Sequence, residues 1–534
     1  MPGLDEAQPI RKLSGAGMEL TQSLHRACQI NPDGLAIVYG QVRRTWREFH
    51  AAVASSAGML RQLGVREDTK VAIVSMNSDR FVECLYSVPW AGGVLVPVNF
   101  RLQFEELAYV VEHSEAELIL FEEQFSALAG ELLQRNPRLR HAMVMDAERS
   151  ALPGALSYGH EVARAMPLPD TRRGGSDLAA IFYTGGTTGV PKGVMHTHDS
   201  LFQFLLTFLI CERIDSSLVH LHVTPMFHMS CIGVLVTTAV AGTHIILPKF
   251  EPEEALRAID AHGVTTCLSV PVMFERMLFH PNIDAYHLSS LRMLGYGASP
   301  MPPRILEEAR RRFPQLQFAQ GYGMTEAPGP VYLAPEYHSQ EAVDAGLTRA
   351  AGRAVPTCEV RIVDSEDHEV EPGSVGEIVI RGPVVMAGYW KNPELTREVI
   401  RDGWLHTGDG GYMDSAGFIY ITDRIKDMII SGGENVYSTE VEGVVSRHPA
   451  VAQCAVIGIP SEQWGESVHA IVTLHDGASA TSSEITAFCR ERIAAYKCPR
   501  SVEIRTQPLP MTAAGKILKA QLREPFWANR SRRI

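Results

Sequence analysis

Thr184-Gly185-Gly186-Thr187-Thr188-Gly189-Val190-Pro191-Lys192-Gly193 directly follows Asp177 to Tyr183, a run typical of a buried strand. Glycines let backbone amides approach an anion closely, and threonine hydroxyls donate further hydrogen bonds. Lys192 adds a positive charge. A strand that leads into such a segment predicts a triphosphate-binding loop in an α/β protein. The alternative is a flexible, glycine- and threonine-rich surface loop.

The spacing within this loop excludes a Walker A phosphate loop. That motif places glycine before its lysine and serine or threonine after it. Here Pro191 precedes Lys192 and Gly193 follows it. The chain is therefore not a P-loop NTPase.

Length and composition describe a large, ordered globular protein. At 534 residues the chain is too long for one ordinary compact domain, and its 45% hydrophobic and 21% charged residues show no bias toward disorder. The net charge of -12 argues against binding to nucleic acid, since such proteins carry a basic surface. Nine scattered cysteines without a Cys-x-x-Cys pair indicate reduced thiols.

The N-terminus is acidic and lacks the apolar core of a signal peptide. The most apolar run, Leu201 to Ile210, is shorter than the roughly 20 residues of a membrane span. We interpret that run as a buried helix and expect a cytoplasmic protein.

Alternating helical and extended patterns predict a doubly wound α/β body. The expected strands and helices of this body are Lys70 to Ser75, Phe104 to His113, Glu117 to Phe121, Asp177 to Tyr183, Pro252 to His262, Leu291 to Gly295 and Pro303 to Phe313.

After Arg353 the pattern changes to short strands between Gly, Pro and Asp turns, which predicts a β-rich subdomain. After Arg424 it becomes a small α+β unit. We expect an N-terminal domain over 1–423, a hinge at 424–427 and a C-terminal lid domain over 428–534.

The phosphate-loop segment resembles the signature of the adenylate-forming superfamily, which contains acyl-CoA synthetases, luciferases and peptide-synthetase adenylation domains. Its usual form is Tyr-Thr-Ser-Gly-Thr-Thr-Gly-x-Pro-Lys-Gly, and Gly186 stands where serine is more usual. The resemblance extends from about Glu19 to Lys519 with the motifs in family order. It implies that ATP contacts Thr184, Gly185, Gly186, Thr187, Thr188, Gly189 and Lys192.

A second segment, Gln320-Gly321-Tyr322-Gly323-Met324-Thr325-Glu326, resembles the adenine and magnesium motif of the same family. The resemblance implies that Tyr322 stacks on adenine, that Thr325 touches the α-phosphate, and that Glu326 holds Mg²⁺ with Thr184. Mg²⁺ favours few carboxylates together with phosphate oxygens. A tight turn with a solvated glutamate is the alternative. Gly297, Ala298 and Ser299 resemble the companion loop along adenine and the acyl group.

Three further positions match family motifs. Asp409 matches the aspartate that binds the ribose hydroxyls, and Arg424 matches an arginine that contacts ribose or phosphate, unless it forms only a surface ion pair. Lys516 matches the lysine of the C-terminal motif, which places a point charge where carboxylate and α-phosphate meet. Without its flanking pattern, Lys516 would be taken for an exposed lysine.

His228, in Pro225-Met226-Phe227-His228, resembles a gate between the acyl group and the thiol channel, although a hydrogen-bonded histidine at a strand end is the commoner case. We expect His228, Glu326 and Lys516 to be the catalytic residues. The resemblance implies an apolar substrate pocket formed by His228, Met229, Tyr296, Gly297, Ala319, Met324 and Pro328.

The resemblance also implies a hinge at Lys426, about which the small domain turns to present first Lys516 and then Gly432 and Gly433 to the reaction. A double glycine lets pantetheine pass close to the backbone, and a simple β-turn is the alternative. The CoA nucleotide is expected at Trp464, Tyr496 and Arg500, with Arg101 a weaker candidate; ordinary surface packing is the alternative for all four.

The implied reaction is acyl-adenylate formation from ATP and a carboxylate, with Mg²⁺, followed by transfer to coenzyme A. Fatty and aromatic acids both suit an apolar pocket. A carrier protein as acceptor, luciferase-like oxidation and a non-catalytic nucleotide-binding protein stay open alternatives, and the oligomeric state, a homodimer among the options, stays undetermined.

Overall fold

The computed structural model describes residues 17–184, 191–212, 214–299, 301–424, 427–431, 434–511 and 517–528. They form two compact units. The first comprises the chain up to Thr348 with Val355–Cys358 and Gly382–Glu398, and the second comprises Arg349–Ala354, Glu359–Arg381 and Val399 onward. The β-rich strands after Arg353 are thus grouped with the C-terminal residues, and the hinge proposed at 424–427 falls inside the second unit.

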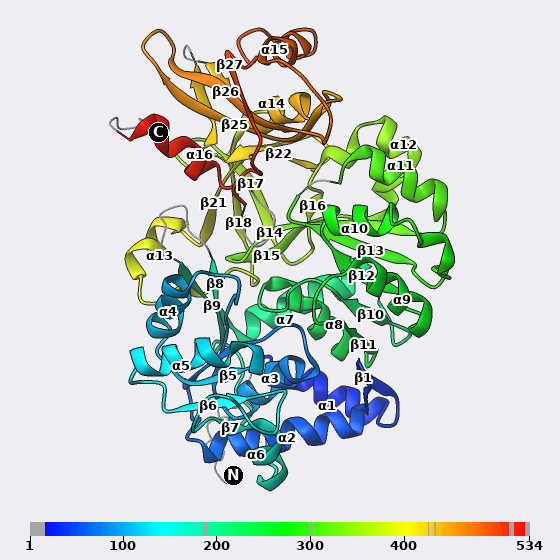
Figure 1. Ribbon diagram of the computed structural model, residues 1–534, viewed down its shortest axis with the longest axis vertical. Coiled ribbons are helices and arrows are strands. Elements are labelled where there is room, and N and C mark those ends of the chain that lie inside the picture. Colours follow the sequence, from blue (N-terminus) through cyan, green and yellow to red (C-terminus); the bar gives the residue numbers. More distant parts are fainter. Residues whose placement is uncertain are drawn as a thin grey trace, which may run out of the picture. The chain divides into compact units, whose positions relative to one another are not determined.

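The first unit contains two sheets (Figure 1). In one of them β14, β13, β12, β10, β11 and β1 are parallel neighbours in that order, β15 pairs antiparallel with β14, and β2 pairs antiparallel with β1. Among the strands of the first unit the spatial order is β15 (Ala327–Leu333), β14 (Gln317–Met324), β13 (Met293–Gly297), β12 (Thr266–Ser269), β10 (Val219–His222), β11 (Thr243–Ile246), β1 (Leu35–Tyr39) and β2 (Val42–Thr45).

The other sheet is parallel from β8 to β7 and antiparallel at β9 and β19. Its order is β19 (Gly388–Tyr389), β9 (Lys192–Thr197), β8 (Leu178–Thr184), β4 (Val94–Pro97), β3 (Lys70–Val74), β5 (Ala116–Phe121), β6 (His141–Val144) and β7 (Leu156–Ser157). The predicted doubly wound α/β body is confirmed.

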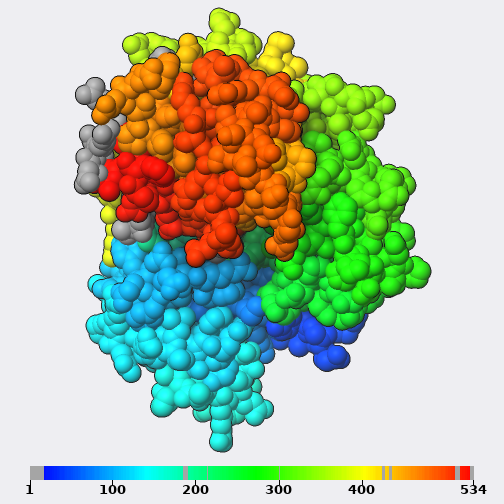
Figure 2. Space-filling model, turned by 45° about the horizontal axis from the view of Figure 1, so that its top comes forward, coloured from blue at the N-terminus to red at the C-terminus, as the bar shows by residue number. Residues whose placement is uncertain are grey.

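Helices connect and cover these strands. Their bounds are α1 (Leu20–Ile30), α2 (Trp46–Gln62), α3 (Asp79–Trp90), α4 (Phe104–His113), α5 (Ser126–Arg135), α6 (Tyr158–Arg164), α7 (His198–Glu212), α8 (Ile232–Ala239), α9 (Pro252–His262), α10 (Pro271–Leu278), α11 (Pro303–Arg312), α12 (Gln340–Asp344) and α13 (Pro393–Val399). Helix α5 and the segments around it, cyan in Figure 2, form part of the outer surface of this unit.

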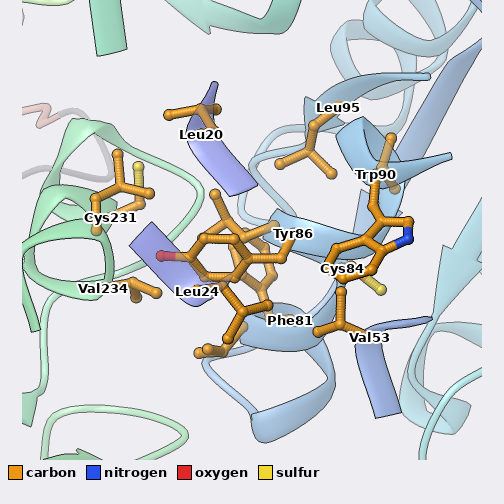
Figure 3. Packing of buried hydrophobic residues seen from close by; sticks show 14 of the residues in the cluster. Leu20, Leu24, Val53, Phe81, Cys84, Tyr86, Trp90, Leu95, Cys231 and Val234 are labelled. Atoms are coloured by element: carbon orange, nitrogen blue, oxygen red, sulfur yellow. The ribbon is translucent and has the colours of Figure 1, made fainter. Parts of the chain in front are cut away.

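One hydrophobic cluster joins side chains of both sheets to helices α1, α2, α3, α7 and α8. Figure 3 shows Tyr86 and Phe81 of α3 facing Leu24 of α1 and Val234 of α8. Fully burying side chains of this size contributes roughly 1.5–3 kcal/mol each. This cluster thus joins the two sheets of the first unit to each other.

Most predicted elements are present, but the bounds of one strand and the burial of one helix differ from the prediction. The strand expected at Leu291 to Gly295 is β13, Met293–Gly297, because Leu291 is buried in the turn before the strand. Gly297 therefore ends a strand instead of following one. Helix α7 extends beyond the apolar run at both ends, and Ile210 is 54% exposed, so only one face of this helix is buried.

The second unit contains two further sheets. One has the order β17 (Glu359–Val363), β18 (Gly376–Arg381), β21 (Trp404–Met413) and β20 (Ile400–Arg401), with β22 (Ile419–Arg424) paired to β21. The other has the order β24 (Glu434–Val436), β23 (Ile429–Ser431), β26 (Gly465–Leu474) and β25 (Val451–Ser461), with β27 (Ser501–Arg505) parallel to β26. The remaining elements are β16 (Arg353–Ala354), α14 (Ser438–Val445), α15 (Ser482–Arg490) and α16 (Lys519–Trp527).

The small α+β part has its own hydrophobic core of residues from β23 to β26, α14 and α15. All nine cysteines are described and none forms a disulfide. Over the described ranges, no helix combines the length and apolar character that crossing a membrane would require.

Candidate active site

Strands β8 and β9 form the hairpin that carries the predicted phosphate loop. Thr184, the last residue of β8, pairs with Lys192, the first residue of β9, and the loop residues 185–190 that connect them lie outside the described residues. A Cβ atom on Gly193 would lie 3.0 Å from Tyr183 Cζ and 3.2 Å from Trp390 Cβ. A side chain at this position would therefore force Tyr183 or Trp390 to shift at the base of the loop.

A second turn, between β14 and β15, presents Thr325 and Glu326. His196 Nε2 lies 2.7 Å from the Thr325 carbonyl oxygen, and its Nδ1 lies 3.0 Å from Ser200 Oγ. Burial lowers the pKa of His196 to about 4, so the ring is neutral at pH 7. Nε2 must then donate to the carbonyl while Nδ1 accepts from Ser200. The Met386 amide donates to the Glu326 carbonyl at 2.8 Å and fixes the other side of the turn.

Tyr389 joins the Glu326 turn to the phosphate-loop hairpin. Its hydroxyl donates to Glu326 Oε1 at 2.7 Å, and Lys192 Nζ lies 5.4 Å from the centre of its ring. Tyr389 reaches both because β19 pairs with β9 next to Val194. Glu326 is 7% exposed, so this hydrogen bond orients a carboxylate that has little contact with water.

The expected adenine side lies at the ends of β13 and β14. Gly297 and Gly321 are register partners, and a Cβ on Gly297 would come within 2.7 Å of the Gly321 carbonyl oxygen. Ala298 has a φ of 66°, a left-handed conformation that is costly for a residue with a side chain and is found at functional turns. Ala298 and Ser299 are exposed, as a loop that receives a flat base requires.

The residues of this region fit a nucleotide and a cation. Among the described residues, no atom lies within 4 Å of the position that a Cβ on Gly321 would take, and none donates a hydrogen bond to the buried Gln320 Oε1. Tyr322 is half-buried and Gly323 is exposed. Nowhere in the described part of the chain do three or more His, Cys, Asp or Glu side chains gather as metal ligands. A cation at Glu326 would therefore also need phosphate oxygens, as Mg²⁺ commonly does.

The loop that carries His228 is held by Asn77, which is 3% exposed. Asn77 Nδ2 donates to the Thr224 carbonyl at 2.9 Å, and its Oδ1 accepts from the Met226 amide at 2.8 Å. His228 Nε2 is buried without a hydrogen-bond partner among the described residues. Burial, and then the charge of Arg101, lowers the pKa of His228 to about 4, so a neutral ring is available to a ligand.

The other residues expected in the acyl pocket differ in their surroundings. Ala319 is buried in β14, Met229 and Met324 are half-buried, and Pro328 is buried in β15. The Tyr296 side chain belongs to a separate hydrophobic cluster, where its hydroxyl lies 2.9 Å from His338 Nε2. Any contact of Tyr296 with a substrate would therefore come from its backbone.

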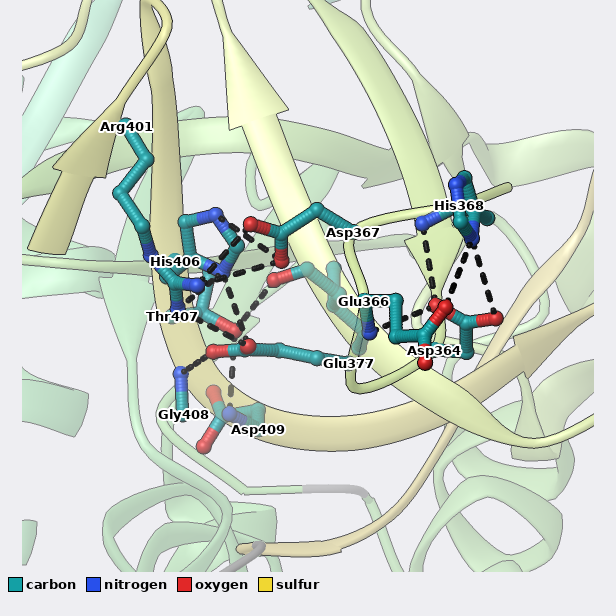
Figure 4. Close-up of polar contacts among 11 residues, drawn as sticks. Asp364, Glu366, Asp367, His368, Glu377, Arg401, His406, Thr407, Gly408 and Asp409 are labelled. Atoms are coloured by element: carbon teal, nitrogen blue, oxygen red, sulfur yellow. Dashed lines mark hydrogen bonds and ion pairs between the residues drawn. The ribbon is translucent and has the colours of Figure 1, made fainter. Parts of the chain in front are cut away.

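In the second unit, Asp409 lies at an irregularity in β21, where the register with β18 shifts (Figure 4). The Gly408 amide donates to Glu377 Oε1 at 2.9 Å, and Gly408 has a φ of 70°. Thr407 Oγ1 donates to the Ile378 carbonyl at 2.7 Å and accepts from the Asp409 amide at 3.0 Å. The backbone on both sides of Asp409 is thus fixed, which suits a residue that must meet a ligand in one orientation.

The structure brings two of the expected CoA residues together. The Arg500 guanidinium lies 4.4 Å from the ring centre of Trp464 and donates to Ser431 Oγ at 3.0 Å. Trp464 is 37% exposed and Tyr496 is 39% exposed, an unusual exposure for large aromatic side chains. Arg101, in the first unit, is exposed beside the rings of Phe100 and Phe227.

Several expected site residues lie outside the described residues, and their roles stay predictions. They are Gly185, Gly186, Thr187, Thr188, Gly189, Lys426, Gly432, Gly433 and Lys516. Arg424 ends β22 opposite Asp409 in the register of β21, but its side chain is not described.

Sequence reasoning missed Tyr389, His196 and Asn77. Tyr389 is separated by 63 residues from Glu326, and His196 by 129 from Thr325, so no local spacing connects them. The one local signal is that His196 lies in the strand that follows the phosphate loop.

Comparison with known proteins agrees with this geometry. The AMP-binding enzyme family model matches residues 24–390, and the AMP-binding enzyme C-terminal domain model matches residues 440–516. A feruloyl-CoA synthase of Amycolatopsis sp is 38% identical over 507 residues, which cover 94% of this chain and 98% of that protein. The fatty acid–[acyl-carrier-protein] ligase ScoC of Streptomyces coeruleorubidus is 33% identical over 521 residues, which cover 96% and 97%.

Among solved structures, the o-succinylbenzoate CoA synthetase of Bacillus subtilis in complex with its acyl-adenylate intermediate is similar, with a TM-score of 0.83 and 29% identity. The similarity covers 94% of this chain and 97% of that one. Both family models thus match in order along one chain whose fold is that of an adenylate-forming enzyme. The chain therefore belongs to the AMP-binding enzymes, the adenylate-forming superfamily that includes the acid:CoA ligases.

Proposed function

We propose that this protein activates an apolar carboxylate, a fatty or aromatic acid, with ATP and transfers the acyl group to coenzyme A. The observation that carries the proposal is the contact of Tyr389 with both Glu326 and Lys192. Through this contact a buried carboxylate and a lysine ammonium group lie beside the same tyrosine at the β8–β9 hairpin. An adenylating enzyme needs such a pair, because it must hold a triphosphate and its cation together.

The first step forms a bond between a substrate carboxylate oxygen and the α-phosphorus of ATP and releases pyrophosphate. The second forms a bond between the CoA sulfur and the acyl carbon and releases AMP. Neither step needs a protein nucleophile, so the residues act by position and charge. Glu326 and Thr184 would hold Mg²⁺, which supplies positive charge beside the phosphate oxygens when bound.

The other roles follow the family resemblance. We assign Tyr322 to the adenine, Asp409 to the ribose hydroxyls and Lys516 to the oxygens that meet in the first step. His228, with its neutral ring and unpartnered Nε2, suits a gate residue beside the acyl group. Lys426 is the proposed hinge between the two steps.

Purified protein with ATP, Mg²⁺ and a panel of carboxylates tests the proposal through pyrophosphate release and CoA consumption. Both are expected with at least one apolar acid. Lys516→Ala should lower pyrophosphate release by about a hundredfold or more, on the scale of losing one charge-stabilising group. It should still form thioester from supplied acyl-adenylate and CoA. Absence of pyrophosphate release with every acid would refute the proposal.

A carrier protein is the second candidate acceptor, because the similar ScoC is a fatty acid–[acyl-carrier-protein] ligase. Pyrophosphate release without CoA consumption, followed by acylation of a phosphopantetheinylated carrier protein, would favour that acceptor. Thioester formation with free CoA favours the first.

A further inference from the structure

One face of β13 and β14 carries almost no side chains. Gly295 and Gly297 of β13 pair with Ala319 and Gly321 of β14, and register partners in a sheet point their side chains to the same face. Tyr332 of β15 is the partner of Gly321 and shares that face. No atom of the described residues lies within 4 Å of a Cβ built on Gly321, so there is open space beside Gly321 on this face.

Helix α7 packs against β15, and its Glu212 reaches β13. Phe204, Phe208 and Glu212 follow one another at intervals of four residues and so lie on one side of the helix. A Cβ on Gly329 of β15 would lie 2.8 Å from Phe204 Cε2 and 3.3 Å from Phe208 Cε2. The two phenylalanine rings meet edge to face at 5.3 Å. The two rings therefore lie against Gly329 of β15. The neighbouring glycine floor consists of Gly295 and Gly297 of β13 with Ala319 and Gly321 of β14.

Glu212 lies at one end of this floor. Its Oε1 is 3.9 Å from the position that a Cβ on Gly295 would take, beside Leu268 of β12. Burial raises the pKa of Glu212 to about 7, and the Tyr332 hydroxyl, which lowers it, is the one other contributor. No cationic side chain of the described residues is close enough to offset the burial of this carboxyl group.

Tyr332 is the residue that interacts with Glu212 at this end of the glycine floor. Burial, and then the charge of Glu212, raises the pKa of the Tyr332 phenol. The Tyr332 hydroxyl oxygen is buried and has no well-formed hydrogen bond within the described residues. Glu212 and Tyr332 thus interact, but no hydrogen bond of ordinary geometry is formed at the Tyr332 hydroxyl by the described residues. A buried polar pair with incomplete hydrogen bonding lowers the free energy of unfolding unless a ligand supplies the missing hydrogen bonds.

We propose that the glycine floor of β13 and β14 receives the ring of an aryl acid, and that Glu212 and Tyr332 bind a phenolic hydroxyl at the end of the ring farthest from the carboxylate. The inference rests on the proposed function and names the substrate class of that same site. From Gly295 to Gly297 the strand rises about 6.6 Å, which is comparable with the length of a substituted benzene ring.

The hydroxyl is the group that fits both partners. A phenol donates its proton to the Glu212 carboxylate and accepts from the Tyr332 hydroxyl, so both polar groups are paired. An unsubstituted ring or an alkyl chain leaves both unpaired, and a methoxy group has no proton to donate. A site built to bind a hydroxyl group discriminates strongly against the analogue that lacks it.

The test compares kcat/KM for cinnamate and its 4-hydroxy, 4-methoxy and 4-amino derivatives, with octanoate and decanoate beside them. The native protein is expected to favour 4-hydroxycinnamate over cinnamate and 4-methoxycinnamate by about tenfold or more, the effect of one buried hydrogen bond to a charged group. Glu212→Leu and Tyr332→Phe should each reduce this preference to within about threefold while cinnamate is still used. Glu307→Gln, an exposed change on α11, should keep it.

The outcomes separate the inference from the proposed function. Turnover of fatty acids or of unsubstituted cinnamate above that of the hydroxylated acid leaves a ligase but refutes the hydroxyl site. Preference for the 4-amino acid, or a hydroxyl preference that survives in both variants, refutes it equally. Because Tyr332→Phe removes one oxygen atom only, a folding failure of Glu212→Leu does not block the test. No pyrophosphate with any of these acids would count against the proposed function instead.

Discussion

The Glu326 carboxylate keeps its orientation through a residue 63 positions away. Tyr389 donates to it at 2.7 Å while its ring lies beside Lys192. Tyr389 therefore has two roles: its hydroxyl orients the Glu326 carboxylate, and its ring contacts the Lys192 ammonium group. Substitution by phenylalanine removes only the first.

Tyr389→Phe should lower the free energy of unfolding by about 1.5–3 kcal/mol, the range for a hydrogen bond to a charged group. It should raise the Mg²⁺ concentration needed for half-maximal ATP binding, because the carboxylate is no longer held in one position. Denaturant unfolding and calorimetric ATP titration over a Mg²⁺ series measure the two effects. An unchanged Mg²⁺ dependence of ATP binding would show that Tyr389 has only a structural role.

Arg500→Ala tests the candidate CoA residues of the second unit. The variant removes the guanidinium that lies over Trp464 and donates to Ser431 Oγ. We expect the KM for CoA to rise about tenfold, the size of one lost charge-assisted hydrogen bond, with pyrophosphate release unchanged. Arg447→Ala is the control, since Arg447 is exposed just after α14. An equal loss in both half-reactions would instead indicate damage to the second unit itself.

At the scale of elements, the β8–β9 hairpin, which carries the predicted phosphate loop, is closely packed at its base. Gly193 sits against Tyr183 and Trp390, and the Trp390 amide donates to the Gly193 carbonyl at 2.7 Å. The Trp390 indole in turn donates to the His113 carbonyl at 3.0 Å. The hairpin is thus tied to β19 and to the end of α4.

Gly193→Ala should destabilise the protein by about 1–3 kcal/mol, the usual effect of overpacking, and should reduce ATP affinity because the loop base must shift. Gly159→Ala is the matched control: Gly159 lies in α6, and nothing lies within 4 Å of its added Cβ. That change should be neutral or stabilising by up to about 1 kcal/mol. Equal unfolding free energies for the two variants would contradict the packing argument.

Over the whole molecule, buried histidines make the first unit sensitive to acid. Burial lowers the pKa of His196, His220 and His338 to about 4 and that of His244 to about 3. These pKa values are lower in the folded chain than the ordinary value of about 6.5 in the unfolded chain. The unfolded state therefore binds more protons between pH 6.5 and 4, and stability is lost as the pH falls through that range.

We expect the denaturant midpoint to be steady above pH 7 and to fall steeply from pH 6.5 to 4. Each such histidine contributes a slope of at most about 1.4 kcal/mol per pH unit. His220→Gln should flatten the slope by about one histidine's share, whereas His287→Gln, an exposed change, should leave it as it is. A midpoint that does not change between pH 7 and pH 5 would contradict this account.

Local patterns determined most elements, because strand and helix periodicity and the turn residues act over a few positions. Helices α4 and α9 begin and end where the sequence predicts them. The glycine- and threonine-rich loop and the Gln320 to Glu326 segment likewise indicated nucleotide chemistry, since phosphate binding needs particular residues at fixed spacing.

What the sequence by itself determined is the α/β architecture, the adenylate-forming motifs and the identity of the residues that carry charge. What only the tertiary structure decided is which distant groups support them: Tyr389 on Glu326, His196 on Thr325, Asn77 on the His228 loop, and Glu212 with Tyr332 at the glycine floor. The physical reason is that strand pairing and helix packing bring together residues that are far apart in the sequence, and no local pattern connects such residues. The residues of a motif, in contrast, are neighbours in the sequence and can be recognised from it.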